Sequence, residues 1–242
     1  MIPARWLDYL YPPSCHFCDA PLRKGRYLCD ACRAKLHPIA TPFCLRCGMP
    51  FDGALPDHFE CHQCRGQDLS FEFARAAYLA RDEARELMHS FKYEKQLHLH
   101  RDLASLAADA WDDPRLATQT APPWTLVPVP LHWRRKQWRW FNQAEEIART
   151  LARERNLPLV KALRRVRYTT QQTRLHRRAR LENLRGAFRL ARRVARRQPL
   201  RGKPVLLIDD VFTTGSTANE CARVLKAEAG AEKVVVLTVL RG

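Results

Sequence analysis

Two adjacent carboxylates and a hydroxyl-rich turn follow an apolar run in the segment VLLIDDVFTTGST, residues 205–217. Asp209 and Asp210 offer acceptor oxygens to the hydroxyl groups of a sugar. The turn after them offers hydroxyls and backbone N–H groups to a phosphate, and the positive end of a following helix would strengthen its binding. The segment therefore predicts a ribose phosphate site, with phosphate contacts from Thr213, Thr214, Gly215, Ser216 and Thr217.

A strand, a loop and a helix are needed to position these groups. The four apolar residues 205–208 predict a buried central strand of a parallel sheet, and residues 216–229 predict a helix that ends at Gly230. In open α/β sheets ligands bind beyond the carboxyl ends of the strands, so the aspartates are expected to face the ligand. The alternative is a surface turn in which Thr214 or Ser216 only caps a helix, which would leave the acid pair unexplained.

The same residues resemble the 5-phosphoribosyl-1-pyrophosphate (PRPP) binding motif of type I phosphoribosyltransferases. In that family two acids hold the ribose 2′ and 3′ hydroxyls, and the turn holds the 5′-phosphate. The resemblance implies an α/β fold, with a parallel sheet flanked by helices, and Mg²⁺ bound together with PRPP. It also implies a catalytic role for Asp209 and Asp210, which would stabilise the positive charge on the sugar as pyrophosphate leaves.

Eight of the nine cysteines form four C-x-x-C pairs in the first part of the chain. Two thiolates at this spacing reach one tetrahedral ion, and two pairs close a four-sulfur zinc site that has no open position for catalysis. The sequence therefore predicts two structural zinc ions. Sequential pairing is the simplest arrangement, although the spacing leaves the pairing order open. The predicted ligands are Cys15, Cys18, Cys29, Cys32, Cys44, Cys47, Cys61 and Cys64.

A disulfide framework is the alternative interpretation of these cysteines. No basic start followed by a continuous apolar run marks a signal peptide, so a reducing, cytoplasmic location is expected and zinc is favoured. His16, His58 and His62 are expected to be bystanders, because eight paired thiolates are already present. Cys221 stands alone, inside the helix after the phosphate turn, and is expected only to pack.

A double zinc ribbon joined to a PRPP-type domain is the arrangement of the ComF family of competence-associated proteins. Residues 124–143, WTLVPVPLHWRRKQWRWFNQ, resemble that family's VPVP-L-x-x-R-R and RGFNQ segments, and residues 170–188 resemble its T-x-x-Q and N-L-x-x-A-F segments. Lys92 and Tyr93 resemble its K-Y pair. Trp140 stands where the pattern usually has glycine, so a positive φ is in question there, and an added stacking face is the alternative.

Two domains are expected, a double zinc ribbon over residues 1–68 and a phosphoribosyltransferase-like domain over residues 69–242. With 46% hydrophobic residues the chain can build one α/β core besides a small metal module. The strand at 234–240 is expected beside 205–208, through a right-handed crossover. Residues 112–123 predict a surface loop. Other expected elements are strands at 71–80 and 125–129 and helices at 83–93, 98–111 and 142–155, the last capped by Asn142.

Arginines accompany two segments that the resemblance places near pyrophosphate. Pro128 and Pro130 form a stiff turn, and guanidinium groups close to it suit bidentate phosphate contacts. A sheet-edge turn before a solvated cationic helix is the alternative. Residues 170–183 resemble the mobile loop that closes over PRPP in these enzymes. The predicted pyrophosphate and loop contacts are Arg134, Arg135, Arg139, Arg174 and Arg177.

The net charge of +17 is concentrated in one segment. Residues 161–203, here called the basic belt, contain sixteen Lys and Arg and one acid, which is +15 of the total. Four thiolates give a zinc site a charge of about −2, so residues 1–68 become net negative. We therefore expect single-stranded DNA to bind the basic belt, while a solvated arm or a loop over a small polyanion is the alternative. The predicted nucleic-acid contacts are Arg177, Arg178, Arg180, Arg192 and Arg193.

Two functions of different classes remain open on this sequence. The first, which the ComF resemblance implies, is a protein of DNA uptake and natural transformation that binds PRPP or a related sugar phosphate and single-stranded DNA. The second is an active Mg²⁺-dependent phosphoribosyltransferase with an unidentified acceptor. No G-x-x-x-x-G-K-[ST] motif occurs, so an ATP-driven DNA translocase would be a separate partner. No apolar run approaches the roughly 18 residues of a membrane span.

Overall fold

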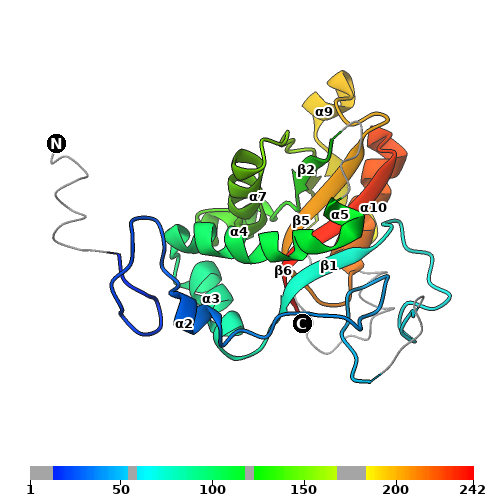
Figure 1. Ribbon diagram of the computed structural model, residues 1–242. Coiled ribbons are helices and arrows are strands. Elements are labelled where there is room, and N and C mark those ends of the chain that lie inside the picture. Colours follow the sequence, from blue (N-terminus) through cyan, green and yellow to red (C-terminus); the bar gives the residue numbers. More distant parts are fainter. Residues whose placement is uncertain (1–12, 54–58, 118–122, 168–183) are drawn as a thin grey trace, which may run out of the picture.

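A computed structural model describes residues 13–53, 59–117, 123–167 and 184–242. Its main sheet has four parallel strands (Figure 1). A smaller antiparallel sheet pairs β3 (Leu163–Arg165) with β4 (Phe188–Leu190). The α/β class expected from the sequence is confirmed. The strands of the main sheet are, in spatial order, β1 (Ala74–Leu79), β6 (Lys233–Arg241), β5 (Pro204–Phe212) and β2 (Thr125–Pro128).

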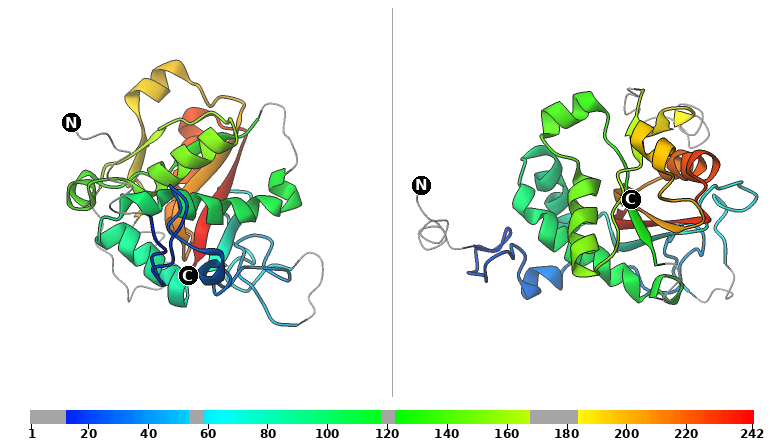
Figure 2. Two further views of the ribbon diagram at one scale, coloured as in Figure 1. Left: turned by 60° about the vertical axis from the view of Figure 1, so that its left-hand side comes forward. Right: turned by 90° about the horizontal axis from the view of Figure 1, so that it is seen from above.

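Helices cover both faces of the main sheet (Figure 2). One face carries α4 (His100–Ala108) and α7 (Gln143–Glu154), and the other carries α10 (Ser216–Ala229). Within the described residues, no helix is long and apolar enough to span a membrane. The remaining helices of the described segments are α2 (Asp30–Arg33), α3 (Asp82–Tyr93), η1 (Leu97–Leu99), η2 (Asp109–Asp112), α5 (Pro114–Ala117), α6 (Trp133–Arg139) and α9 (Arg192–Arg197).

Alternate residues of β5 enter two different hydrophobic clusters. Leu206 and Ile208 pack on the side of α4 and α7, whereas Val205 and Leu207 pack on the side of α10, and all four are 0% exposed. A strand buried on both faces needs apolar side chains in both directions. This is the physical reason for the unbroken apolar run that predicted a central strand.

The strand, loop and helix unit of the predicted ligand site is present. α10 begins at Ser216 and is terminated by its C-cap residue Gly230, as the sequence predicts, and the φ of Gly230, 66°, lies in the left-handed region. β6 lies parallel to β5 and next to it, with Val205 opposite Val234. The predicted neighbourhood of these two strands is therefore confirmed.

β5 is longer than the sequence predicts. Because β6 extends to Arg241, the pairing of the two strands continues to Phe212. Asp209 therefore lies within the last part of the strand, opposite Thr238, and not in the loop that follows. Its backbone is fixed by the sheet.

The two cysteine-rich segments lie on different sides of the molecule (Figures 1 and 2). Cys15 and Cys32 belong to the hydrophobic cluster that contains α3 and α4, whereas Cys44 and Cys61 belong to the cluster that contains α10. Each segment therefore contributes to a core that it shares with one face of the main sheet. A domain boundary at residue 68 stays a prediction.

The surface loop expected at 112–123 is wrong for its first half. α5 occupies part of it, and Asp113 before α5 is only 8% exposed. The Asp113 carboxylate accepts a hydrogen bond from Arg115 Nη2 at 2.7 Å and lies 3.6 Å from Arg75 Nε. An acidic residue can be buried when its charge is paired, and a polar sequence does not reveal such pairing.

Asn142 occupies the N-cap position of α7, as predicted, but its side chain makes no capping hydrogen bond. Its Nδ2 donates instead to the carbonyl oxygen of Val129 at 3.0 Å. This contact fixes the start of α7 against the residue that follows β2.

Candidate ligand site and zinc centres

The acid pair lies at the carboxyl end of β5, where Lys92 of α3 meets it. Lys92 Nζ lies 3.0 Å from Asp210 Oδ2, and both side chains are 15% exposed. The backbone N–H of Asp210 donates to Asp209 Oδ1 at 2.9 Å. Burial raises the pKa of Asp209 to about 7, the neighbouring charge of Asp210 adds to the rise, and Lys92 and Arg165 oppose it. The pair therefore shares a partly desolvated site with nearby cations.

The loop between β5 and α10 is shaped by a glycine. Gly215 has a φ of 76° and occupies the N-cap position of α10. A Cβ at this position would lie 2.6 Å from the ring of Phe212, so a side chain is excluded by both conformation and space. Thr214 Oγ1 and Ser216 Oγ lie 2.9 Å apart on this loop. The first N–H groups of α10 and these hydroxyls thus converge on one end of a helix, which suits an anion.

Arg241, at the end of β6, forms hydrogen bonds with the backbone of this loop. Its side chain is 3% exposed. Its Nη1 donates to the carbonyl oxygens of Phe212 at 3.1 Å and Thr213 at 2.8 Å. Arg241 has no signal in the sequence, because a single arginine in a terminal strand belongs to no motif.

The structure separates the predicted pyrophosphate contacts. Arg134 is exposed on α6, with Cζ 5.3 Å from the ring centroid of Trp133, and Arg135 is half-buried. Arg139 is only 6% exposed and donates to Gln143 Oε1 and to the Tyr93 hydroxyl, each at 3.3 Å. Its guanidinium group has internal partners, so the prediction of an open phosphate contact is not favoured there. Arg174 and Arg177 lie outside the described residues.

Two cations near the acid pair are more prominent in the structure than in the sequence. Lys92 was indicated only by its likeness to the family's K-Y pair, yet it is the direct partner of Asp210. Arg165 of β3 lies close enough to oppose the raised pKa of Asp209. The sequence does not distinguish Arg165 as a neighbour of the acid pair, because it is one of sixteen cations in the basic belt.

The predicted nucleic-acid contacts are not all near the acid pair. Arg192 and Arg193 are exposed on α9, which precedes β5 and lies at the opposite end of the sheet from the chain's carboxyl terminus (Figure 1). The acid pair lies at the carboxyl ends of the strands. The described parts of the basic belt, residues 161–167 and 184–203, thus include Arg165 near the acids and also reach the amino end of β5. Arg177, Arg178 and Arg180 lie outside the described residues.

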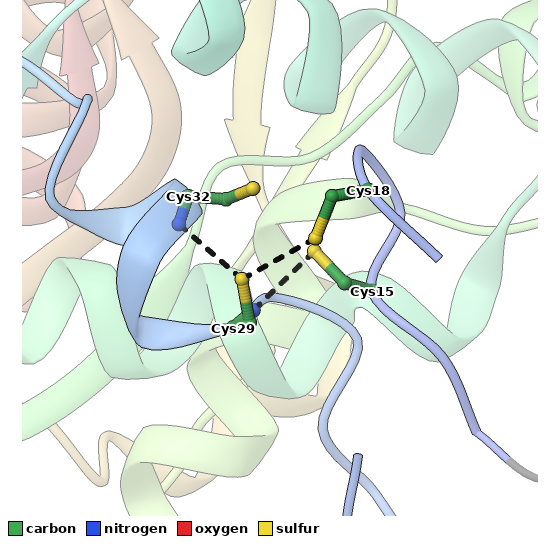
Figure 3. Close-up of side chains that lie close together, drawn as sticks. All are labelled: Cys15, Cys18, Cys29 and Cys32. Carbon is green, nitrogen blue, oxygen red and sulfur yellow. Dashed lines mark hydrogen bonds between the residues drawn. The ribbon is translucent and has the colours of Figure 1, made fainter. Parts of the chain in front are cut away.

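The eight paired cysteines form two clusters in the sequential order. The first contains Cys15, Cys18, Cys29 and Cys32 (Figure 3), the second contains the other four, and within each the sulfur atoms lie within 4.8 Å of one another. None of the described cysteines is in a disulfide. His16 and His62 belong to neither cluster, and Cys221 is 0% exposed among apolar residues.

The sulfur positions fit zinc. Four ligands at about 2.3 Å in a tetrahedron place neighbouring sulfurs about 3.8 Å apart. Cys18 and Cys29 have their sulfurs 3.6 Å apart, and Cys47 and Cys61 have theirs 3.7 Å apart. The backbone N–H of Cys29 points at Cys15 Sγ at 3.5 Å (Figure 3), as expected for donors around zinc-bound thiolates. Two structural zinc ions of four sulfurs each are therefore supported, and the sequential pairing is confirmed.

Trp140 adopts the backbone conformation that the family's glycine suggests. Its φ is 70°, in the left-handed region. The indole is 72% exposed, and Lys95 Nζ lies 4.1 Å from its ring centroid. Both alternatives stated for this position are thus realised together, because the positive φ is kept and the ring adds a stacking surface.

These features define a class of protein, a double zinc ribbon combined with a parallel α/β sheet that carries an acid pair and a loop suited to bind an anion.

Residues 6–65 match the family model of the double zinc ribbon domain. The chain is 31% identical over 215 residues to competence protein F of Haemophilus influenzae, with 88% of this chain and 90% of that protein covered. It is 30% identical over 217 residues to DNA utilization protein YhgH of Escherichia coli K12, with 88% and 91% covered. It is 26% identical over 230 residues to competence protein ComFC of Bacillus subtilis, with 91% and 86% covered. The chain belongs to the ComF family.

Proposed function

We propose that this protein handles DNA during uptake into the cell, as a cytoplasmic protein that binds single-stranded DNA and PRPP or a related sugar phosphate. The names of its relatives, competence protein F, ComFC and DNA utilization protein, support the role in DNA uptake. The basic belt supports the contact with nucleic acid, since +15 of charge far exceeds what one pyrophosphate requires. An ATP-driven translocase would act as a separate partner chain.

The observation that carries the ligand proposal is the relation between the acid pair and the loop before α10. Asp209 and Asp210 would hold the two ribose hydroxyls, and Thr213, Thr214, Gly215, Ser216 and Thr217 would surround the 5′-phosphate. Lys92 keeps the pair from repelling an anionic ligand, because it balances one of the two carboxylates. Mg²⁺ would bind with the ligand and screen its pyrophosphate.

Calorimetric titration with PRPP and Mg²⁺ tests this site. Asp210→Asn and Thr214→Val should each weaken binding, the former by roughly 1.5 to 3 kcal/mol for a lost charged hydrogen bond. Asp112→Asn, on an exposed carboxylate of η2, is the control for charge and should bind as the wild type does. Unchanged affinity in both site variants, with the fold intact, would show that the motif holds no such ligand.

Fluorescence anisotropy with a labelled single strand tests the contact with DNA. The logarithm of the affinity should fall by about 0.7 per neutralised phosphate for each unit of log salt. Arg192→Glu combined with Arg193→Glu should weaken binding, and so should the triple reversal of Arg177, Arg178 and Arg180. Reversal of Arg81 and Arg85, two exposed arginines near the start of α3, imposes the same charge change as the Arg192 and Arg193 pair outside the basic belt. Equal losses of affinity in the Arg192 and Arg193 variant and in the Arg81 and Arg85 variant would mean that only net charge matters. That result would contradict the assignment of DNA binding to the basic belt.

A phosphoribosyltransferase activity is the second candidate. It is favoured by the burial of the Asp209 carboxyl beside Asp210, which raises the pKa of Asp209 to about 7, since raised carboxyl pKa values are frequent at functional sites. Release of pyrophosphate from PRPP in the presence of Mg²⁺ and a panel of acceptors would establish it. Binding of PRPP without release of pyrophosphate would leave this sugar phosphate as a ligand of the DNA-handling protein.

A further inference from the structure

A cavity of about 270 Å³ lies beside β2, between the Pro128–Pro130 turn, the start of α7 and β3. Pro128, Pro130 and Leu163 contribute apolar surface to it, and the indole of Trp133, which is 57% exposed, forms one wall. Ligand sites for drug-sized molecules usually exceed about 300 Å³, so this cavity has room for one flat ring and little more. Its walls suit the faces of an aromatic ring.

The polar edge of the cavity includes two side chains with acceptor oxygens, Asn142 and Glu145, beside the cations described below. Asn142 is 8% exposed and commits its Nδ2 to the Val129 carbonyl, and among the described residues no donor meets its Oδ1. Glu145 also lines the cavity, and its Oε1 accepts a hydrogen bond from Arg149 Nη2 at 2.6 Å and pairs with Lys161 Nζ. Acceptors at the edge of an apolar slot select rings with amino hydrogens, such as cytosine, over rings that present a carbonyl there, such as thymine.

The rim of the cavity belongs to the basic belt. Lys161, Arg164 and Arg165 line it, and Arg164 is exposed. A ring that enters the slot would therefore have a polyanionic backbone placed over cations. The combination of one stacking slot and a cationic track is how proteins hold unpaired strands.

We propose that this cavity, the Trp133 pocket, receives one unpaired, amino-bearing base of a single DNA strand that runs along the basic belt. The inference rests on the proposed contact with DNA and deepens it by naming where a base is read. Phosphate contacts alone give little sequence preference, so this pocket is the source of a preference for cytosine over thymine.

The test compares the affinities of full-length protein for labelled strands about 12 nucleotides long that contain only cytosine, only thymine or no bases. Trp133→Ala should weaken binding of the cytosine strand about 5-fold or more, the equivalent of one lost stacking contact. It should leave binding of the baseless strand unchanged, since that strand uses the belt alone. Trp133→Phe keeps an aromatic face and should restore most of the loss.

Trp138→Ala is the matched control, because Trp138 lies on the same helix and is 58% exposed, but does not line the cavity. Equal losses in Trp138→Ala and Trp133→Ala, or equal affinity of wild type for cytosine and thymine strands, would overturn the pocket. Absence of any DNA binding by wild type would instead refute the proposed function.

A free base could supply the same ring chemistry, and a competition arm separates the two sources. A single stacked base raises the affinity by a factor of only about 5 to 140, so a free nucleoside should bind the pocket weakly. Millimolar free deoxycytidine should therefore leave the cytosine strand bound. Displacement of the strand by free deoxycytidine would assign the pocket to a free nucleobase and overturn the assignment to DNA.

Discussion

Arg241 Nη2 lies 4.0 Å from Cys47 Sγ, so one buried side chain contacts both the second zinc centre and the ligand loop. The other end of the same guanidinium group holds the carbonyl oxygens of Phe212 and Thr213. A cation beside a zinc-bound thiolate stabilises its negative charge, and outer contacts of this kind tune metal affinity. The second zinc centre and the loop before α10 are therefore supported by a common residue.

Arg241→Met should loosen both structures, because it keeps the apolar stem but removes every donor. We expect one of the two zinc ions to pass to a chromogenic chelator faster than in wild type, and the affinity for PRPP to fall at least several-fold. Arg139→Met is the control, since Arg139 is also buried but its partners within the described chain are Gln143 and Tyr93, away from the zinc centres. Equal zinc release from both variants would mean that Arg241 acts only through general stability.

The pKa of Asp209 predicts how stability depends on pH. Its folded value of about 7 lies above the ordinary carboxyl value, so between about pH 4 and pH 7 the folded state binds more protons than the unfolded state. Stability is therefore lost as the pH rises through this window. Asp209→Asn removes this penalty and should raise the melting temperature relative to wild type at pH 8, but not at pH 4. Solvent screening at a partly exposed site limits the gain in free energy of unfolding to the order of 1 kcal/mol, which corresponds to a rise in melting temperature of ~2–4 °C.

Lys92→Met provides the companion measurement. Lys92 favours the charged form of Asp209, so its removal should raise the pKa of Asp209 further and shift the pH-dependent transition upward. Thermal melts of both variants from pH 4 to pH 9 check the sign. If the stability of Asp209→Asn relative to wild type increases toward acid pH, the raised pKa of Asp209 is contradicted.

The zinc centres should stabilise the whole chain and not only their own segments. Metal analysis should find two zinc ions per chain. Cys15→Ser and Cys64→Ser should each retain one and lower the melting temperature of the main transition, because each cysteine belongs to a core shared with one face of the sheet. Cys221→Ala, at a buried cysteine outside both clusters, should retain two. A main transition that stays in place while a separate, earlier one appears would mean that the ribbons are independent domains.

Local patterns predicted the part of the site that is continuous in sequence. The β5 and α10 unit was predictable because a strand buried on both faces must be apolar and because Gly230 ends the helix. The residues that complete the site come from elsewhere in the chain. Lys92 reaches Asp210 from α3, and Arg241 reaches the loop from β6. Their roles depend on how the strands are ordered in the sheet, which no single segment of the sequence encodes.

Buried charged residues could not be predicted from the sequence for a related reason. Arg139 and Asp113 lie in polar stretches that indicate exposure, yet both are less than a tenth exposed. Each is buried because the fold supplies partners, Tyr93 and Gln143 for the arginine and Arg115 for the aspartate. Side chains of this kind satisfy their charge through tertiary contacts, and composition alone assigns them to the surface.

Trp140 allows a test of backbone strain at the turn before α7. A non-glycine residue in the left-handed region costs about 1–2 kcal/mol, whereas the exposed contact of the indole with Lys95 returns roughly 0.5–1 kcal/mol. Trp140→Ala should lose the contact and keep the strain, so it should be less stable than wild type. Trp140→Gly also loses the contact but relieves the strain, at the expense of a more flexible unfolded chain.

The order of the two variants is the decisive result. Glycine ordinarily destabilises relative to alanine by roughly 0.5–1 kcal/mol, but at a φ of 70° the strain term is larger, so Trp140→Gly should be more stable than Trp140→Ala by up to about 1 kcal/mol. Denaturant unfolding of both variants measures this difference. Asn156 also has a positive φ, of 52°, and Asn156→Gly compared with Asn156→Ala is a control that should give the same order. If alanine is the more stable residue at 140 and glycine at 156, the turn at Trp140 does not hold a left-handed backbone in solution.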